Sequence, residues 1–167
     1  MNVVGRGRTV LVAAIVAVLA IGSCSSDSPE DSHVRAEAVY DSVVRWFAQR
    51  ESGDPDPLPV FIEPRGEGAS IQLDVQAKVV DSTKDVATVR FIDTRDEALV
   101  TNDDGVVVVA DDGVLLRLDP VVEKGNSVKL DVDVHDRDDH FVTYEFDLDR
   151  SGETWRIDRP PVEVPGA

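Results

Sequence analysis

The clearest pattern in the chain is a stripe of apolar side chains at helical spacing between residues 29 and 50. Its members recur at intervals of three and four residues: Val39, Tyr40, Val43, Val44 and Phe47. Ser28 is a favoured N-cap, and Pro29 is tolerated at the first helical position. We therefore predict an amphipathic helix over residues 29–50. The proline-rich segment 53–59 ends this helix and is predicted to lie outside any paired strand.

Residues 70–82 carry a pattern that fits two structures. Their apolar side chains alternate as in a strand, and they also fit one side of a helix. We favour a helix capped by Ser70, because helix-forming residues fill its middle. The apolar runs Val60–Ile62 and Val86–Ile92 on either side predict buried strands. Strand, helix and strand would then form a parallel β-α-β unit with the usual right-handed connection.

The next segment predicts short strands between acidic turns. Residues 93–98 suit a helical turn, in which acids act as caps. Val106–Val109 lies between two turn sequences rich in aspartate and glycine, and it predicts a strand. Val114–Leu118 follows and is predicted to be its partner strand.

The C-terminal third alternates strictly between apolar and polar residues. This period of two predicts a strand over residues 127–135 and a hairpin in which residues 141–148 pair with residues 153–158. Strict alternation is typical of an antiparallel sheet with one packed face and one wet face. The predicted fold is α+β, with one or two N-terminal helices packed on a mainly antiparallel, curved β-sheet. We assign residues 28–160 to this domain and residues 161–167 to a loose tail.

The N-terminus has the features of a secretory signal: basic Arg6 and Arg8, an apolar run too short to span a bilayer comfortably, and small residues after it. Its last residues, Ile21-Gly22-Ser23-Cys24, resemble the lipobox of bacterial lipoprotein signal peptides. The resemblance implies a signal peptide over residues 1–23, a diacylglyceryl group on the thiol of Cys24, and residues 24–27 as a lipidated tether. The protein would then be anchored on the extracytoplasmic face of the cell membrane. The alternative is an uncleaved membrane anchor over residues 9–21.

The net charge of the chain limits the classes of partner that it can bind. The chain holds 17 basic and 33 acidic residues, and residues 1–23 contain two of the bases and no acid. The remainder therefore repels phosphate backbones and anionic head groups, so we expect no nucleic-acid partner. Cys24 is the only cysteine, which excludes a disulfide within the chain; if Cys24 carries the lipid, no thiol nucleophile and no cysteine-based metal site is left either. The abundance of Arg, Val, Asp and Ala resembles the composition of actinobacterial proteins.

Two acidic segments are candidates for cation binding. Asp147, Asp149, Ser151 and Asp158, with Gly152 between them, match much of the spacing of an EF-hand calcium loop. However, the flanking pattern predicts a β-hairpin, and a motif outside its structural context is weak evidence. Asp131, Asp133 and His135 share one strand face and precede a second acidic run at 136–140. A solvated sheet face produces the same pattern, so we predict no metal and no cofactor.

Candidate catalytic groups are few. The histidines are His33, His135 and His140, and no familiar nucleophile or metalloprotease motif accompanies them. Asp93 lies near Asp96 and Glu97 after a predicted strand, where acids usually act as caps. Trp46 and Trp155 could stack on a sugar, but both fall on or beside apolar stripes and are predicted to lie in the core.

The C-terminal strand, glycine turn and tryptophan strand, residues 148–157, resemble small actinobacterial envelope lipoproteins, and the helix-plus-sheet pattern resembles cystatin-like and NTF2-like domains. Such folds host enzymes, binding modules and scaffolds alike. The sequence favours a non-catalytic binding or scaffold module with an envelope protein partner. A small-ligand carrier or a hydrolase is the alternative, and it requires a pocket with converging polar groups between helix and sheet.

Overall fold

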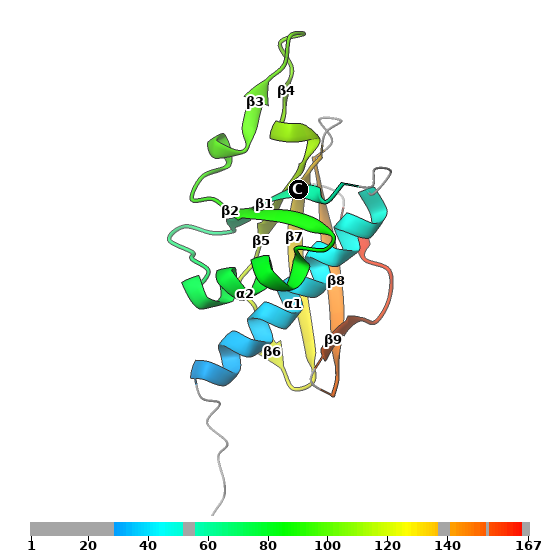
Figure 1. Cartoon of the computed structure of the whole chain (residues 1–167). Coiled ribbons are helices and arrows are strands. Elements are labelled where there is room, and N and C mark those ends of the chain that lie inside the picture. Colours follow the sequence, from blue (N-terminus) through cyan, green and yellow to red (C-terminus); the bar gives the residue numbers. More distant parts are fainter. Residues whose placement is uncertain (1–28, 52–55, 137–140, 153, 165–167) are drawn as a thin grey trace, which may run out of the picture.

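Two helices lie on one face of a curled sheet, and a two-stranded ribbon projects from the domain (Figure 1). The computed structural model describes residues 29–51, 56–136, 141–152 and 154–164. The helices are α1 (Pro29–Glu51) and α2 (Leu73–Thr83), with two short 3-10 helices, η1 (Arg95–Glu97) and η2 (Ala110–Asp112). The strands are β1 (Leu58–Pro64), β2 (Ala87–Phe91), β3 (Leu99–Thr101), β4 (Val107–Val109), β5 (Val114–Leu118), β6 (Glu123–Lys124), β7 (Ser127–His135), β8 (Phe141–Ser151), β9 (Thr154–Ile157) and β10 (Val162–Val164).

The main sheet has the strand order β10-β8-β7-β5-β1-β2, with β6 beside β7 and β9 beside β8. Strand β1 is parallel to both β2 and β5, and the remaining pairs are antiparallel. The predicted α+β fold, with helices packed on a mainly antiparallel curved sheet, is confirmed. The parallel pairing of β1 and β2 around α2 also confirms the β-α-β unit and the helical interpretation of residues 70–82.

The main core lies between the helices and the sheet. The predicted stripe of α1 is buried, and alternate residues of β7 and β8 point toward it. Trp46, Phe47, Tyr144 and Phe146 form an aromatic cluster with edge-to-face contacts, which adds to the area that these rings bury. Trp155 is also buried. Both tryptophans therefore pack in or against the core, as predicted from the sequence.

A second buried cluster lies on the opposite face of the sheet. It joins Phe61, Leu115 and Ile92 to Ala98, which precedes the ribbon, and to Val109, the last residue of β4. Strands β1 and β5 are consequently covered on both faces. This cluster holds the base of the β3–β4 ribbon against the domain.

The predicted partner of residues 106–109 was wrong. Strand β4 pairs with β3, whereas β5 lies between β1 and β7 in the main sheet. The physical reason is burial, because β5 is apolar on both faces and gains more from a central position than from a short hairpin. Asp111 and Asp112 adopt positive φ angles of 56° and 53°, and the chain changes direction there.

Three smaller predictions also need correction. Gln72, rather than Ser70, occupies the N-cap of α2, because Ile71 is drawn into the core ahead of the helix. Leu58 and Pro59 belong to β1, where they pair with β2. The pairing of β1 with β5 begins only at Val60, so it needs no hydrogen bond from the proline nitrogen. Val162–Val164, predicted to lie in a loose tail, form β10 and extend the sheet beside β8.

Candidate functional site

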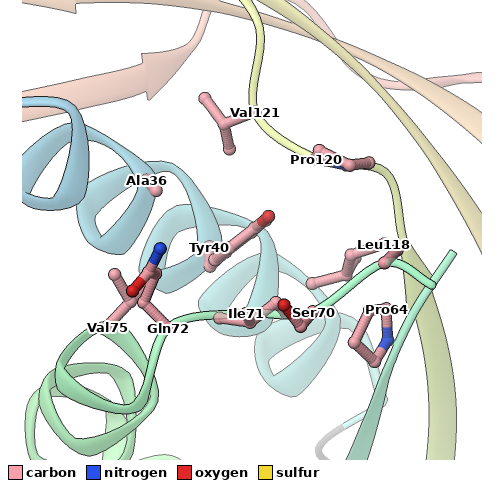
Figure 2. A pocket seen from close by; sticks show the side chains of 11 residues that line it. Ala36, Tyr40, Pro64, Ser70, Ile71, Gln72, Val75, Leu118, Pro120 and Val121 are labelled. Atoms are coloured by element: carbon pink, nitrogen blue, oxygen red, sulfur yellow. The ribbon is translucent and has the colours of Figure 1, made fainter. Parts of the chain in front are cut away.

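A cavity of about 260 Å³ opens at one end of the main core (Figure 2). Its walls come from α1, from the start of α2 with the segment before it, and from the ends of β1 and β5 with the residues that follow β5. The lining residues are Ala36, Tyr40, Pro64, Ala69, Ser70, Ile71, Gln72, Val75, Leu118, Pro120 and Val121. The cavity therefore lies between helix and sheet, where the sequence analysis required a pocket for a ligand carrier.

The backbone topology creates this space. Strands β1 and β5 run parallel and end side by side, with Pro64 opposite Leu118. The chain then leaves β1 through residues 65–72 before it enters α2. The side chain of Gln76 donates a hydrogen bond to the carbonyl of Ile71 at 2.8 Å, which fixes this connection against the first turn of α2. Beyond the ends of β1 and β5, the segments that follow these two strands diverge, and α1 covers the space between them.

Tyr40 supplies the most buried polar group of the cavity. Its side chain points across the space toward the segment at Pro120 and Val121 (Figure 2), and its hydroxyl donates to the carbonyl oxygen of Asp119 at 3.2 Å. Burial raises the pKa of Tyr40 to about 12, so the phenol stays protonated near neutral pH. The hydroxyl of Ser70 and the amide of Gln72 are the other polar side-chain groups of the lining.

None of the eleven lining residues carries a charge. This is notable because 30% of the chain consists of charged residues. The lining also contains no histidine or acid that could activate Ser70 as a nucleophile. The arrangement suits a small, uncharged and mainly apolar ligand that gains a few hydrogen bonds.

A second hollow of about 200 Å³ lies on the other side of the segment Ala69–Ile71. It shares Pro64 and this segment with the first cavity, and it is bounded by Phe91, Ile92 and Asp93 at the end of β2. Leu73 lies at its margin and is 81% exposed. Residues 69–71 therefore form a thin wall with a hollow on either side.

Asp133 is buried in an ion-pair network rather than placed on a solvated face. Its carboxylate accepts a hydrogen bond from Thr143 at 2.8 Å and lies 3.2 Å and 3.4 Å from nitrogens of Arg65 and Arg117. Arg117 also donates to Glu63 at 2.8 Å. The prediction that this face is solvated is wrong at this position, because two arginines from neighbouring strand ends cover the acid.

The remaining members of the predicted cation cluster have separate surroundings. Asp131 lies 3.8 Å from Arg65, and His135 packs edge-to-face against Phe141. Among the described residues, no three His, Cys, Asp or Glu side chains are grouped so that they could hold a metal ion. His140 and Asp138 lie outside the described residues.

The segment that matches calcium-loop spacing forms a β-hairpin, but its pairing differs from the prediction that residues 141–148 pair with residues 153–158. Strand β8 continues to Ser151, only its last four residues pair with β9, and residues 143–145 pair with β10 instead. Strand β8 pairs with β9 from Leu148 opposite Ile157 to Ser151 opposite Thr154. Asp147 forms ion pairs with Lys129 and Arg159, and the hydrogen bond from Arg159 lowers the pKa of this aspartate. The first acid of the motif is therefore neutralised by side chains of the protein itself.

The acids that follow β2 act as a cap, as predicted. The carboxylate of Glu97 accepts hydrogen bonds from the backbone N–H groups of Asp93 and Thr94 at 3.0 and 3.1 Å. Together with the side chain of Thr94, it completes a capping box around η1. Cys24 lies outside the described residues, as do the side-chain surroundings of His33.

Sequence reasoning missed the cavity as a site. Tyr40 was recognised only as part of the helical stripe, and Ser70 only as a cap. The available signal was the polar hydroxyl of Tyr40 within an otherwise apolar stripe, because a buried phenol needs a partner. Its partner, the carbonyl of Asp119, is 79 positions away in the sequence.

Comparison with known proteins gives no match to a family model, to a curated protein or to a solved structure. Within the described residues, no helix combines the length and apolar character needed to cross a membrane.

Proposed function

We propose that this protein is a lipid-anchored, extracytoplasmic binding module without catalytic activity, and that its cavity holds a small, uncharged, mainly apolar ligand. The observation that carries the proposal is the uncharged lining of the cavity in a strongly acidic chain. A binding site needs apolar contact with a few placed polar groups, whereas hydrolysis needs an activated nucleophile or water.

The proposed anchor favours a ligand that partitions into membranes. Cys24 precedes the start of α1 at Pro29 by five residues, and an extended chain of that length spans about 17 Å. Lipidation at Cys24 would therefore hold the domain close to the outer surface of the cell membrane. The proposal includes an envelope protein that delivers or receives the ligand. It includes no nucleic-acid partner, because the net charge of −16 repels phosphate backbones.

The test measures binding of an uncharged apolar dye, N-phenyl-1-naphthylamine, to residues 28–167 produced without signal and lipid. Ala36→Phe places a ring in the cavity from α1, and we expect it to weaken saturable dye binding about tenfold or more by steric exclusion. Ala77→Phe is the matched control, because Ala77 is exposed on α2 and lies outside the lining. It should bind the dye as the parent protein does.

Equal loss in both variants, or no saturable binding in the parent, would contradict the proposed cavity ligand. The competing hydrolase has its own readout. Turnover of nitrophenyl esters that disappears in Ser70→Ala would replace the non-catalytic proposal with an enzymatic one.

A further inference from the structure

The β3–β4 ribbon presents an apolar face that neither buried cluster covers. The ribbon projects away from the sheet and helices (Figure 1). Val100 lies directly opposite Val108, and the hydrogen bond from Asn102 to the carbonyl of Val106 continues the same ladder. By alternation, Val100, Val106 and Val108 share one face, which we call the valine face. Val100 is 47% exposed and Val106 is 39% exposed.

The opposite face of the ribbon is the one that attaches it to the domain. Leu99 and Val109 are paired on that face, and both pack in or against the second buried cluster. The valine face consequently points away from this attachment. An isolated two-stranded ribbon is only marginally stable in water, so its base packing explains why it forms but not why its outer face is apolar.

The edges of the ribbon are also unused within the described residues, because β3 and β4 form a sheet of two strands by themselves. In an antiparallel pair, alternate residues direct their N–H and C=O groups outward. A further extended segment could therefore pair with the ribbon and lay its own alternate side chains beside the valine face.

The charge around the ribbon determines which kind of segment can dock on it. Residues 93–112 contain seven acids and one base, Arg95. The acids are exposed: Asp93, Asp96, Glu97, Asp103, Asp104, Asp111 and Asp112. A second copy of the ribbon would bring like charges together, and anionic head groups would be repelled in the same way. A basic segment, by contrast, is attracted by these exposed acids.

We infer that the ribbon is a docking arm for an extended segment of a partner protein in which apolar side chains alternate with lysine or arginine. The segment adds as a strand, its apolar side chains cover the valine face, and its cations face the surrounding carboxylates. The contact is small, so it belongs to the weak or transient class of interfaces, below about 1,200 Å². This surface is separate from the lining of the cavity, and the inference does not depend on the cavity ligand.

The experiment uses the full chain in mild detergent and fluorescently labelled heptapeptides of alternating valine and lysine. We expect saturable binding that weakens with salt, together with slower hydrogen exchange in residues 99–109. Val100→Ser with Val106→Ser should weaken binding about tenfold or more, because the two changes remove apolar area that the docked peptide would bury. Val162→Ser with Val164→Ser is the matched control, since β10 also carries exposed valines on a short strand, and it should bind as the parent does.

Three results would overturn the docking arm. One is equal binding of an alternating serine and lysine peptide, which would show attraction by charge alone. Another is equal loss of binding in both valine pairs. The third is dimerisation of the parent in sedimentation that the Val100 and Val106 changes abolish, which would make a second copy the occupant. All of the changed residues are exposed, so the variants should keep the melting temperature of the parent.

Discussion

At the scale of single residues, Tyr40 joins the core to the cavity. Its ring belongs to the buried stripe of α1, and its hydroxyl reaches the carbonyl of Asp119 at the cavity wall. Its ordinary pKa of 10.0 is raised to about 12 in the folded protein because ionisation would place a charge in the core. Folding therefore favours the protonated phenol.

This shift predicts a loss of stability in alkali. Because the folded pKa exceeds the unfolded one, the contribution of Tyr40 is fully present below pH 10 and is lost as the pH rises from 10 to about 12. The loss amounts to about 2–3 kcal/mol. In Tyr40→Phe, urea midpoints measured across this range should fall less steeply than in the parent. All other residues are the same in both proteins, so identical slopes would contradict the assignment.

At the scale of elements, the network around Asp133 ties four strands together. Asp133 lies in β7, Thr143 in β8 and Arg117 in β5, and Arg65 directly follows β1. Each strand pair is already held by its backbone ladder. The side-chain network adds a connection across the face of the sheet that α1 and α2 do not cover.

Removing the buried charge tests this role. Asp133→Asn keeps the shape but leaves two guanidinium groups with less charge compensation, so we expect a loss of about 2 kcal/mol in the free energy of unfolding. Asp131→Asn is the control on the same face, because the side chain of Asp131 is 46% exposed, and it should cost less than about 0.5 kcal/mol. Urea denaturation measures both. Similar losses of unfolding free energy in the two variants would mean that the burial of Asp133 makes no extra contribution to stability.

At the scale of the whole molecule, the protein combines a proposed lipid anchor with two separate surfaces that we propose for binding. The cavity opens at the end of the main core, and the ribbon projects from the opposite face of the sheet. Strong net negative charge keeps such a domain soluble and repels anionic membrane surfaces. A position at the membrane would then depend on the proposed anchor rather than on surface attraction.

The anchor itself gives the prediction at this scale. Lipidation needs the thiol, so Cys24→Ala should abolish labelling by a fatty-acid probe and should release the protein or leave the precursor uncleaved. Ser25→Ala changes the neighbouring position without removing the thiol and should keep both the label and the membrane fraction. Equal labelling of the parent and Cys24→Ala would exclude a lipoprotein attached at this residue.

The sequence by itself determined most of the elements and their buried faces, but not the short strands β3, β6 and β10. The stripe of α1 and the alternation of β7 and β8 predicted helix, strands and core because local periodicity reports which side of an element leaves water. It could not assign β4 to β3 instead of β5, because short valine-rich strands satisfy either pairing locally and only burial on both faces decides. The burial of Asp133 and the cavity at Tyr40 were likewise decided by the tertiary structure. Their partners come from distant parts of the chain, and a pattern of hydrophobic and polar positions does not record which distant residues meet.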